Sequence, residues 1–116
     1  MDPEKLQQLI SKAIDDAKGV DIKVLDVRNI SDVADYLVIA SGTSSRHVSS
    51  VADRVVETLR DEHNIKPIGT EGRRNGEWVL LDYGDVIAHV MHPDTRLFYQ
   101  LEKLWGEAGE ISSRND

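Results

Sequence analysis

The turn between a predicted buried strand and a predicted helix holds the first residues that could do chemistry. Gly42-Thr43-Ser44-Ser45-Arg46-His47 follows the apolar run from Tyr36 to Ala40. Free backbone N–H groups at a helix start can hold a phosphate, so this turn is a candidate nucleotide site. It lacks the GxxxxGK[ST] and GxGxxG patterns, however, and a serine there can simply cap the helix. We expect a structural role, with a nucleotide-binding or nucleotidyltransferase-like protein that uses Gly42 to Ser44 as the alternative.

Carboxylates and histidines offer little else. Asp82 and Asp85 lie on either side of a predicted hairpin turn and could in principle share acid–base or metal chemistry, but Asp and Gly are also ordinary turn residues. The histidines have no spacing typical of a zinc site, and the chain contains no cysteine: they are His47, His63, His89 and His92. We therefore expect no metal, no cofactor and no catalytic residue, and predict that the protein is not an enzyme.

The bulk composition indicates one globular domain. The chain has 116 residues, of which 40% are hydrophobic and 30% charged, enough for one core but not for two. No apolar run approaches the roughly 18 residues of a membrane span. The first residues, MDPEKLQQL, do not resemble a signal peptide. Without cysteines there is no sign of disulfides either, so we expect a cytoplasmic protein that does not associate with membranes.

The net charge restricts the partners. The formal charge is −7, from 21 acidic and 14 basic residues. Binding to phosphate backbones depends on clustered lysine and arginine, so we expect no direct, specific nucleic-acid binding. An acidic surface would favour a basic protein partner. A net charge of −7 can equally serve solubility alone.

The first half of the chain predicts two helices and two strands. Asp2 can cap a helix that begins at Pro3 and ends near residue 18, with Gly19 as its C-terminal cap. Its apolar stripe consists of Leu6, Leu9, Ile10, Ala13, Ile14 and Ala17. Strands are expected over 22–27 and 36–40. A second helix is expected from Ser44 to about Glu62, marked by Val48, Val51, Ala52, Val55, Val56 and Leu59.

The second half predicts a hairpin and a last helix. A short strand over 66–69 and a loop over 71–76 precede a hairpin that spans 77–92 and turns at Gly84-Asp85. The last helix begins at Pro93-Asp94, with Leu97, Phe98, Leu101, Leu104 and Trp105 on its apolar side. This order of elements predicts an α/β or layered α+β domain over 1–106, with a mixed sheet, and a flexible tail over 107–116.

Neither side of the hairpin is polar. One numerical parity holds Trp78, Leu80, Val86, Ala88 and Val90, and the other holds Val79, Leu81, Tyr83, Ile87, His89 and Met91. Helices on both faces of the sheet would make all of these residues core. Three helices on five strands can instead leave part of one face open, and an open apolar patch usually marks a partner surface. Trp78 beside Asp82, Tyr83 and Asp85 has the composition of a binding hot spot.

Three longer segments make the chain recognisable. They are DYLVIASGTSSRHVSSVADRVV, GTEGRRNGEWVLLDYGDVIAHVMHP and RLFYQLEKLW, within about residues 20 to 105. In this order and spacing they resemble the ribosomal silencing factor family, also called RsfS, YbeB or Iojap-like. The resemblance implies a mixed five-stranded sheet flanked by helices, a nucleotidyltransferase-like fold without the catalytic acids.

The resemblance also implies a function. Members are non-enzymatic factors that bind the large ribosomal subunit through ribosomal protein L-fourteen and block joining of the small subunit, which represses translation during starvation. It further implies a link to large-subunit assembly and self-association as a homodimer. The partner-binding surface carried over to this chain consists of Trp78, Leu81, Asp82, Tyr83, Gly84 and Asp85, with Glu71 and His89 at its edge. Its apolar side chains would contact the ribosomal protein while its carboxylates face basic residues.

Overall fold

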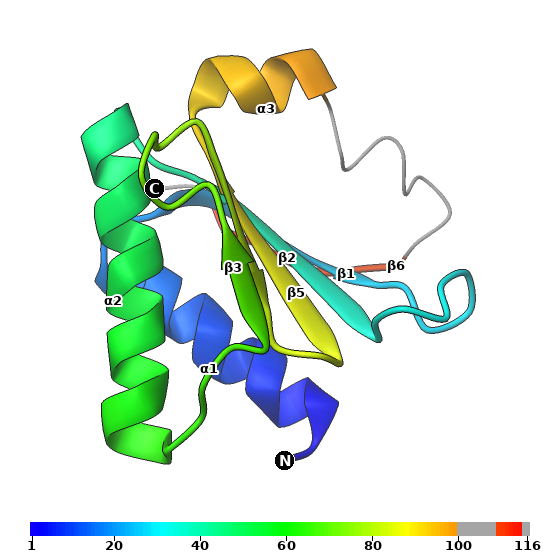
Figure 1. Cartoon of the computed structure of the whole chain (residues 1–116). Coiled ribbons are helices and arrows are strands. Elements are labelled where there is room, and N and C mark those ends of the chain that lie inside the picture. The colour runs from blue at the N-terminus through cyan, green and yellow to red at the C-terminus, as the bar shows by residue number, and fades with distance from the viewer. Residues whose placement is uncertain (100–108, 115–116) are drawn as a thin grey trace.

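A mixed sheet with helices forms the domain, in agreement with the predicted fold class, but the described residues form six strands where five were expected. The computed structural model describes the backbone of residues 1–99 and 109–114. Its elements are α1 (Pro3–Asp16), β1 (Val20–Asp26), β2 (Tyr36–Ser41), α2 (Ser45–His63), β3 (Gly69–Glu71), β4 (Trp78–Asp82), β5 (Val86–Met91), α3 (Pro93–Tyr99) and β6 (Gly109–Arg114) (Figure 1). The strand order is β3-β4-β5-β2-β1-β6, and only the central β2–β5 pair is parallel. Within the described part of the chain, no helix is long and apolar enough to cross a membrane.

Both large helices follow from local signals. The Asp2 side chain accepts a hydrogen bond from the Glu4 N–H at 3.4 Å and caps α1, as predicted. At the other end of α1 the left-handed residue is Lys18, with φ +70°, so the predicted cap at Gly19 is displaced by one residue. The Ser44 hydroxyl caps α2 by accepting from the His47 N–H at 3.1 Å. Asn64, with φ +55°, ends α2 close to the predicted position.

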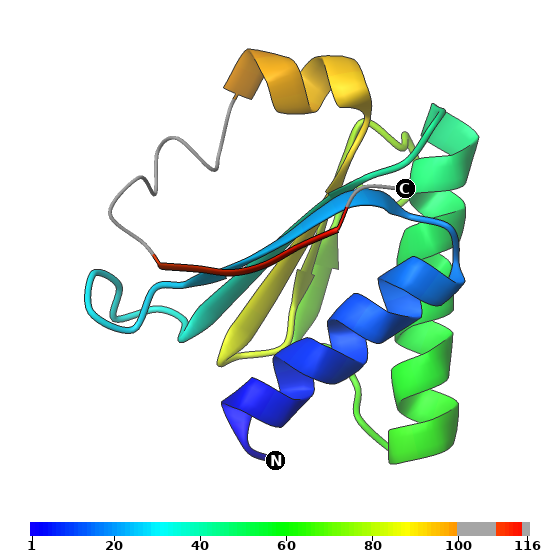
Figure 2. The same cartoon turned by 180° about the vertical axis from the view of Figure 1, so that it is seen from behind.

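The two long helices cover the same side of the sheet. Figures 1 and 2 show α1 and α2 side by side on one face, with α3 apart from them. The apolar stripe of each helix enters one core with alternate strand residues, among them Ile10, Ile14, Val51, Val55, Val38 and Leu81. On the opposite face a smaller cluster contains Leu25, Val27, Leu37, Ile39 and Met91. Every residue of β2 is therefore buried, as its continuous apolar run predicts.

Two strands depart from the sequence prediction. The short strand expected over 66–69 forms instead at Gly69–Glu71, along the edge of β4. The segment 109–114, expected to be part of a flexible tail, forms β6 and pairs antiparallel with β1, with Lys23 opposite Ser113. The tail prediction is thus wrong for these residues. Pairing with the outer edge of β1 uses backbone N–H and C=O groups, so it leaves no apolar pattern in the sequence to recognise.

The last helix begins at Pro93, as predicted, and is described as far as Tyr99. The expected apolar positions Leu101, Leu104 and Trp105 lie outside the described residues. A buried arginine connects α3 to the sheet: the Arg96 guanidinium donates to the Asp21 carbonyl at 2.7 Å and to the Ser41 hydroxyl at 3.0 Å. This anchor holds the start of α3 against the ends of β1 and β2.

Candidate functional site

The β4–β5 hairpin has one face toward the helices and one away from them. Opposed residues share a face, and the opposed pairs include Trp78 with Met91, Leu80 with His89 and Leu81 with Ala88. Each pair joins an even number to an odd one. The sequence analysis put even-numbered residues of both strands on one face and odd-numbered residues on the other. That assignment is wrong, because even-numbered residues of β4 share a face with odd-numbered residues of β5. The outer face of the hairpin consists of Trp78, Leu80, Asp82, Ile87, His89 and Met91.

The structure divides the predicted partner-binding residues into two sets. Trp78, Asp82 and His89 lie on the outer face, and Gly84 and Asp85 form the tip of the hairpin, while Glu71 is exposed on the edge strand β3. Leu81 and Tyr83 instead point into the core beneath the helices, where their exposed fractions are 0% and 8%. The apolar surface comes from Leu80 and Ile87, both half-buried, which the sequence did not single out. Strand alternation could have found them once the register was known.

A hydrogen bond fixes the largest side chain of the outer face. The Trp78 indole N–H donates to Nδ1 of His89 at 2.9 Å, and the two rings are tilted by 53° with centroids 5.9 Å apart. An indole N–H can only donate, so Nδ1 must be unprotonated and the ring proton lies on Nε2. Burial lowers the pKa of His89 from 6.5 to about 4, which keeps the imidazole neutral near pH 7. His89 thus holds the orientation of Trp78.

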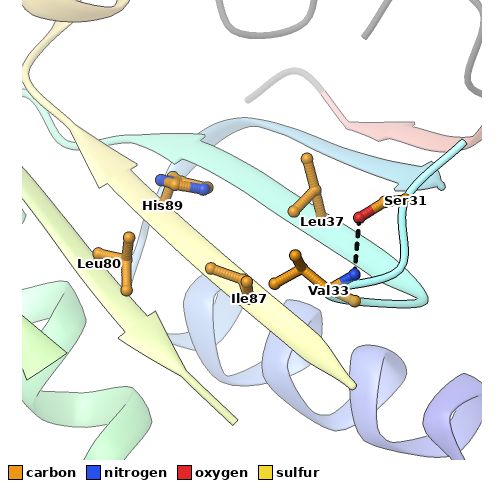
Figure 3. Close-up of a pocket in the computed structure, with 7 residues that line it drawn as sticks. Ser31, Val33, Leu37, Leu80, Ile87 and His89 are labelled. Carbon is orange, nitrogen blue, oxygen red and sulfur yellow. Dashed lines mark hydrogen bonds between the residues drawn. The ribbon is translucent and has the colours of Figure 1, made fainter. Parts of the chain in front are cut away.

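Beside this pair is an apolar pocket of about 270 Å³. Figure 3 shows Leu80 of β4, Ile87 and His89 of β5, and Leu37 of β2 around it, with Val33 from the loop before β2. The full lining is Ser31, Val33, Ala34, Leu37, Leu80, Ile87 and His89. The Ser31 hydroxyl accepts from the Val33 N–H at 3.1 Å, which shapes this loop. The sequence interpretation left the loop out of the site. The signal in the sequence was a pair of apolar residues, Val33 and Ala34, between two aspartates.

Backbone hydrogen bonds hold the hairpin tip against β2. The Asp85 carbonyl accepts from the N–H groups of Asp35 and Tyr36 at 2.7 and 3.1 Å. Within the tip, Oδ1 of Asp82 accepts from the Gly84 N–H at 2.8 Å, and Gly84 has a φ of +88° that favours glycine. The two aspartates considered as an acid pair therefore have the turn roles that we expected.

The Gly42 to His47 turn leads from β2 into α2 and is hydrogen-bonded to the end of α1. The Thr43 N–H donates to Nδ1 of His47 at 2.8 Å, so Nε2 carries the proton and donates to the Ala17 carbonyl at 3.1 Å. The N–H groups of Gly42, His47 and Val48 bond to the Met91 carbonyl, the Ser44 hydroxyl and the Ser44 carbonyl. Four amides near the candidate phosphate site are thus used internally. A Cβ at position 42 would lie 2.7 Å from the Val48 nitrogen, which explains the glycine. The geometry supports the structural interpretation of this turn over the nucleotide alternative.

Comparison with known proteins identifies the family. The protein-family model described as "Ribosomal silencing factor during starvation" (RsfS) matches residues 1–116 of the chain. The chain is 42% identical over 108 residues to "Ribosomal silencing factor RsfS" of Bacillus subtilis, covering 93% of this chain and 91% of that protein. It is 37% identical over 90 residues to "Mitochondrial assembly of ribosomal large subunit protein 1" of Mus musculus, covering 73% of this chain and 38% of that protein.

Solved structures agree with this result. A crystal structure of a Chromobacterium violaceum protein superposes with a TM-score of 0.88 at 37% identity, covering 98% of this chain and 92% of that chain. The similarity includes the segments that carry the outer face and the Gly42 to His47 turn. The chain therefore belongs to the RsfS family of ribosomal silencing factors.

Proposed function

We propose that this protein is a ribosomal silencing factor that binds ribosomal protein L-fourteen on the large subunit and sterically blocks joining of the small subunit. Membership of the RsfS family and the relative named for assembly of the large ribosomal subunit support a ribosomal role. The proposed action is occupancy of a surface, so it needs neither a reaction nor a cofactor. A role in large-subunit assembly is compatible with the same binding site.

The observation that carries this proposal is the outer face of the hairpin. Trp78 is half-buried, is held by His89, and shares the outer face with the half-buried Leu80 and Ile87. A large aromatic side chain that is already oriented loses little conformational freedom on binding, as expected of an interface hot spot. Asp82 and Asp85 add negative charge next to this apolar surface, which suits a basic protein partner.

Co-sedimentation tests the proposal directly. The purified full chain is mixed with isolated bacterial large subunits, small subunits and joined ribosomes, at low and high salt. We expect binding to large subunits alone, and fewer joined ribosomes as protein is added. Binding to small subunits, or no binding at any salt concentration, would contradict the proposed function.

We also propose that self-association uses the outer face, so that a homodimer and the ribosome complex compete. An apolar surface that buries itself in a symmetric dimer is unavailable to another partner, and mass action then couples the two equilibria. Crosslinking with and without large subunits tests this idea, with the dimer yield expected to fall as subunits are added. A dimer that persists on the ribosome would rule out a shared face.

A further inference from the structure

The apolar pocket lies where two acidic segments meet. The hydrogen bond from the Asp35 N–H to the Asp85 carbonyl, 2.7 Å long, places the loop before β2 against the hairpin tip. Together these segments carry four carboxylates, those of Asp32, Asp35, Asp82 and Asp85, and neither 29–35 nor 82–86 contains lysine or arginine. Arg28, at the start of the loop, already forms a hydrogen-bonded ion pair with Asp26 at 2.9 Å. The two segments that meet beside the pocket therefore carry a net negative charge.

The pocket itself is apolar and small. Five of its seven lining residues are aliphatic, and the Val33 side chain at its rim is 77% exposed. Its volume of about 270 Å³ is below the range of roughly 300–1,000 Å³ for small-molecule and cofactor sites. It has room for a large apolar side chain. Apolar anchors that fill such pockets beside an oriented tryptophan are typical of protein interfaces.

We propose that this pocket receives one apolar side chain from a protein segment in which lysine or arginine residues flank that side chain. The apolar lining selects the anchor, and the four carboxylates select its basic neighbours. The inference rests on the proposed function, because the segment belongs to the partner that the outer face binds. It adds the loop from 28 to 35 to the contact surface, together with a specificity for the sequence of the partner.

The chain contains no cysteine, so a single introduced cysteine reports on one position. We would compare Val33→Cys, at the pocket rim, with Glu57→Cys, an exposed position on α2 across the sheet. Each variant is labelled with a maleimide alone and with saturating large ribosomal subunits. With subunits we expect Val33→Cys to react at about one tenth of its free rate or more slowly still. Glu57→Cys should react at its free rate.

A second variant fills the pocket without changing charge. Ala34 lines the pocket and is 5% exposed, so Ala34→Leu adds volume at its wall. We expect about tenfold weaker binding to large subunits, as for the loss of one anchor contact. A thermal melt shows whether the variant remains folded. A benzophenone attached through Val33→Cys should crosslink to a peptide with an apolar residue beside lysine or arginine. Crosslinks only to RNA would overturn the proposal.

The outcomes separate this inference from the proposed function. If the parent chain binds subunits but Val33→Cys keeps its free labelling rate, the pocket inference is wrong and the proposed function stands. If the parent chain does not bind, both fail together. Slow labelling of Val33→Cys without subunits that does not depend on protein concentration would also overturn the inference, because the chain itself would then occupy the pocket.

Discussion

The two faces of the β4–β5 hairpin are built from alternate residues of the same strands, yet they serve different ends. On the helix-covered face, Val79, Leu81, Ala88 and Val90 are completely buried. On the outer face, Trp78, Leu80 and Ile87 keep part of their surface exposed. Both faces carry large apolar side chains. Whether an apolar strand residue stabilises the fold or recognises a partner is therefore decided by what packs above it.

Polar groups also differ between the two faces. On the outer face the Trp78 indole N–H and Nδ1 of His89 satisfy each other. On the helix-covered face the Tyr83 hydroxyl is buried without a hydrogen-bond partner among the described residues, and burial raises its pKa to about 12. A satisfied pair can be kept at a surface at little cost, whereas an unsatisfied hydroxyl in a core lowers the free energy of unfolding. Four measurements would sharpen or break this contrast between the faces.

The largest effect is expected at Leu81. Leu81→Ala removes a fully buried side chain from the core and should lower the free energy of unfolding by about 2–5 kcal/mol. Urea denaturation measures this loss. Where the variant is still folded, its affinity for large subunits should match that of the parent chain. A loss of affinity without a loss of stability would place Leu81 at the interface, as the family resemblance first implied.

Acid should weaken the fold through His89. Its pKa of about 4 in the folded state lies below the usual 6.5, so the folded state binds fewer protons than the unfolded state between these values. The free energy of unfolding is therefore unaffected by His89 above pH 6.5 and decreases as the pH falls toward 4. The total decrease is about 3 kcal/mol. Urea denaturation from pH 4 to 7 should show this slope. His89→Gln, which keeps an acceptor for the indole, should show a shallower one, and equal slopes would exclude His89 as the cause.

Trp78→Ala should act mainly on binding. We expect an affinity loss of about 2 kcal/mol or more, roughly 30-fold, for large subunits. Binding isotherms from co-sedimentation give the loss, and a thermal melt shows whether the domain remains folded. Trp78→Phe is the matched variant: it keeps an apolar ring but cannot donate to His89, so an intermediate loss is expected. A folded Trp78→Ala protein with normal affinity would remove the outer face from the proposed site.

The smallest effect is expected at Tyr83. Tyr83→Phe removes the buried hydroxyl that has no partner among the described residues, and should raise the free energy of unfolding by about 1 kcal/mol. Urea denaturation with an unchanged m-value would report this gain. Binding to large subunits should not change, because the ring stays in the core. A destabilised variant would show that the hydroxyl makes a contact after all.

Local features of the fold were predictable from the sequence. The caps at Asp2 and Ser44 depend on hydrogen bonds within three residues, and the helix stripes repeat every three or four positions, so each signal lies inside a short window. The family resemblance placed Trp78, Asp82 and His89 in the site, and all three lie on the outer face.

Features that depend on distant contacts were not predictable. The face of Leu81 depends on the register across the hairpin turn, which the numerical parity does not give. The pocket needs β2, β5 and the loop before β2 to meet, and β6 pairs through its backbone alone. The buried Arg96 bonds to residues 55 and 75 positions away, and no helical periodicity indicates such an anchor.

The parallel β2–β5 pairing has a consequence for folding kinetics. Tyr36 lies opposite Val86, so about half of the chain must be bridged before this ladder can close. Contacts between residues so distant in sequence carry a large loop-closure entropy and slow folding. The pocket lies over this ladder, with Leu37 on one strand and Ile87 and His89 on the other. A partially folded chain would therefore lack the pocket, and only a chain that has completed this long-range pairing would present the whole surface.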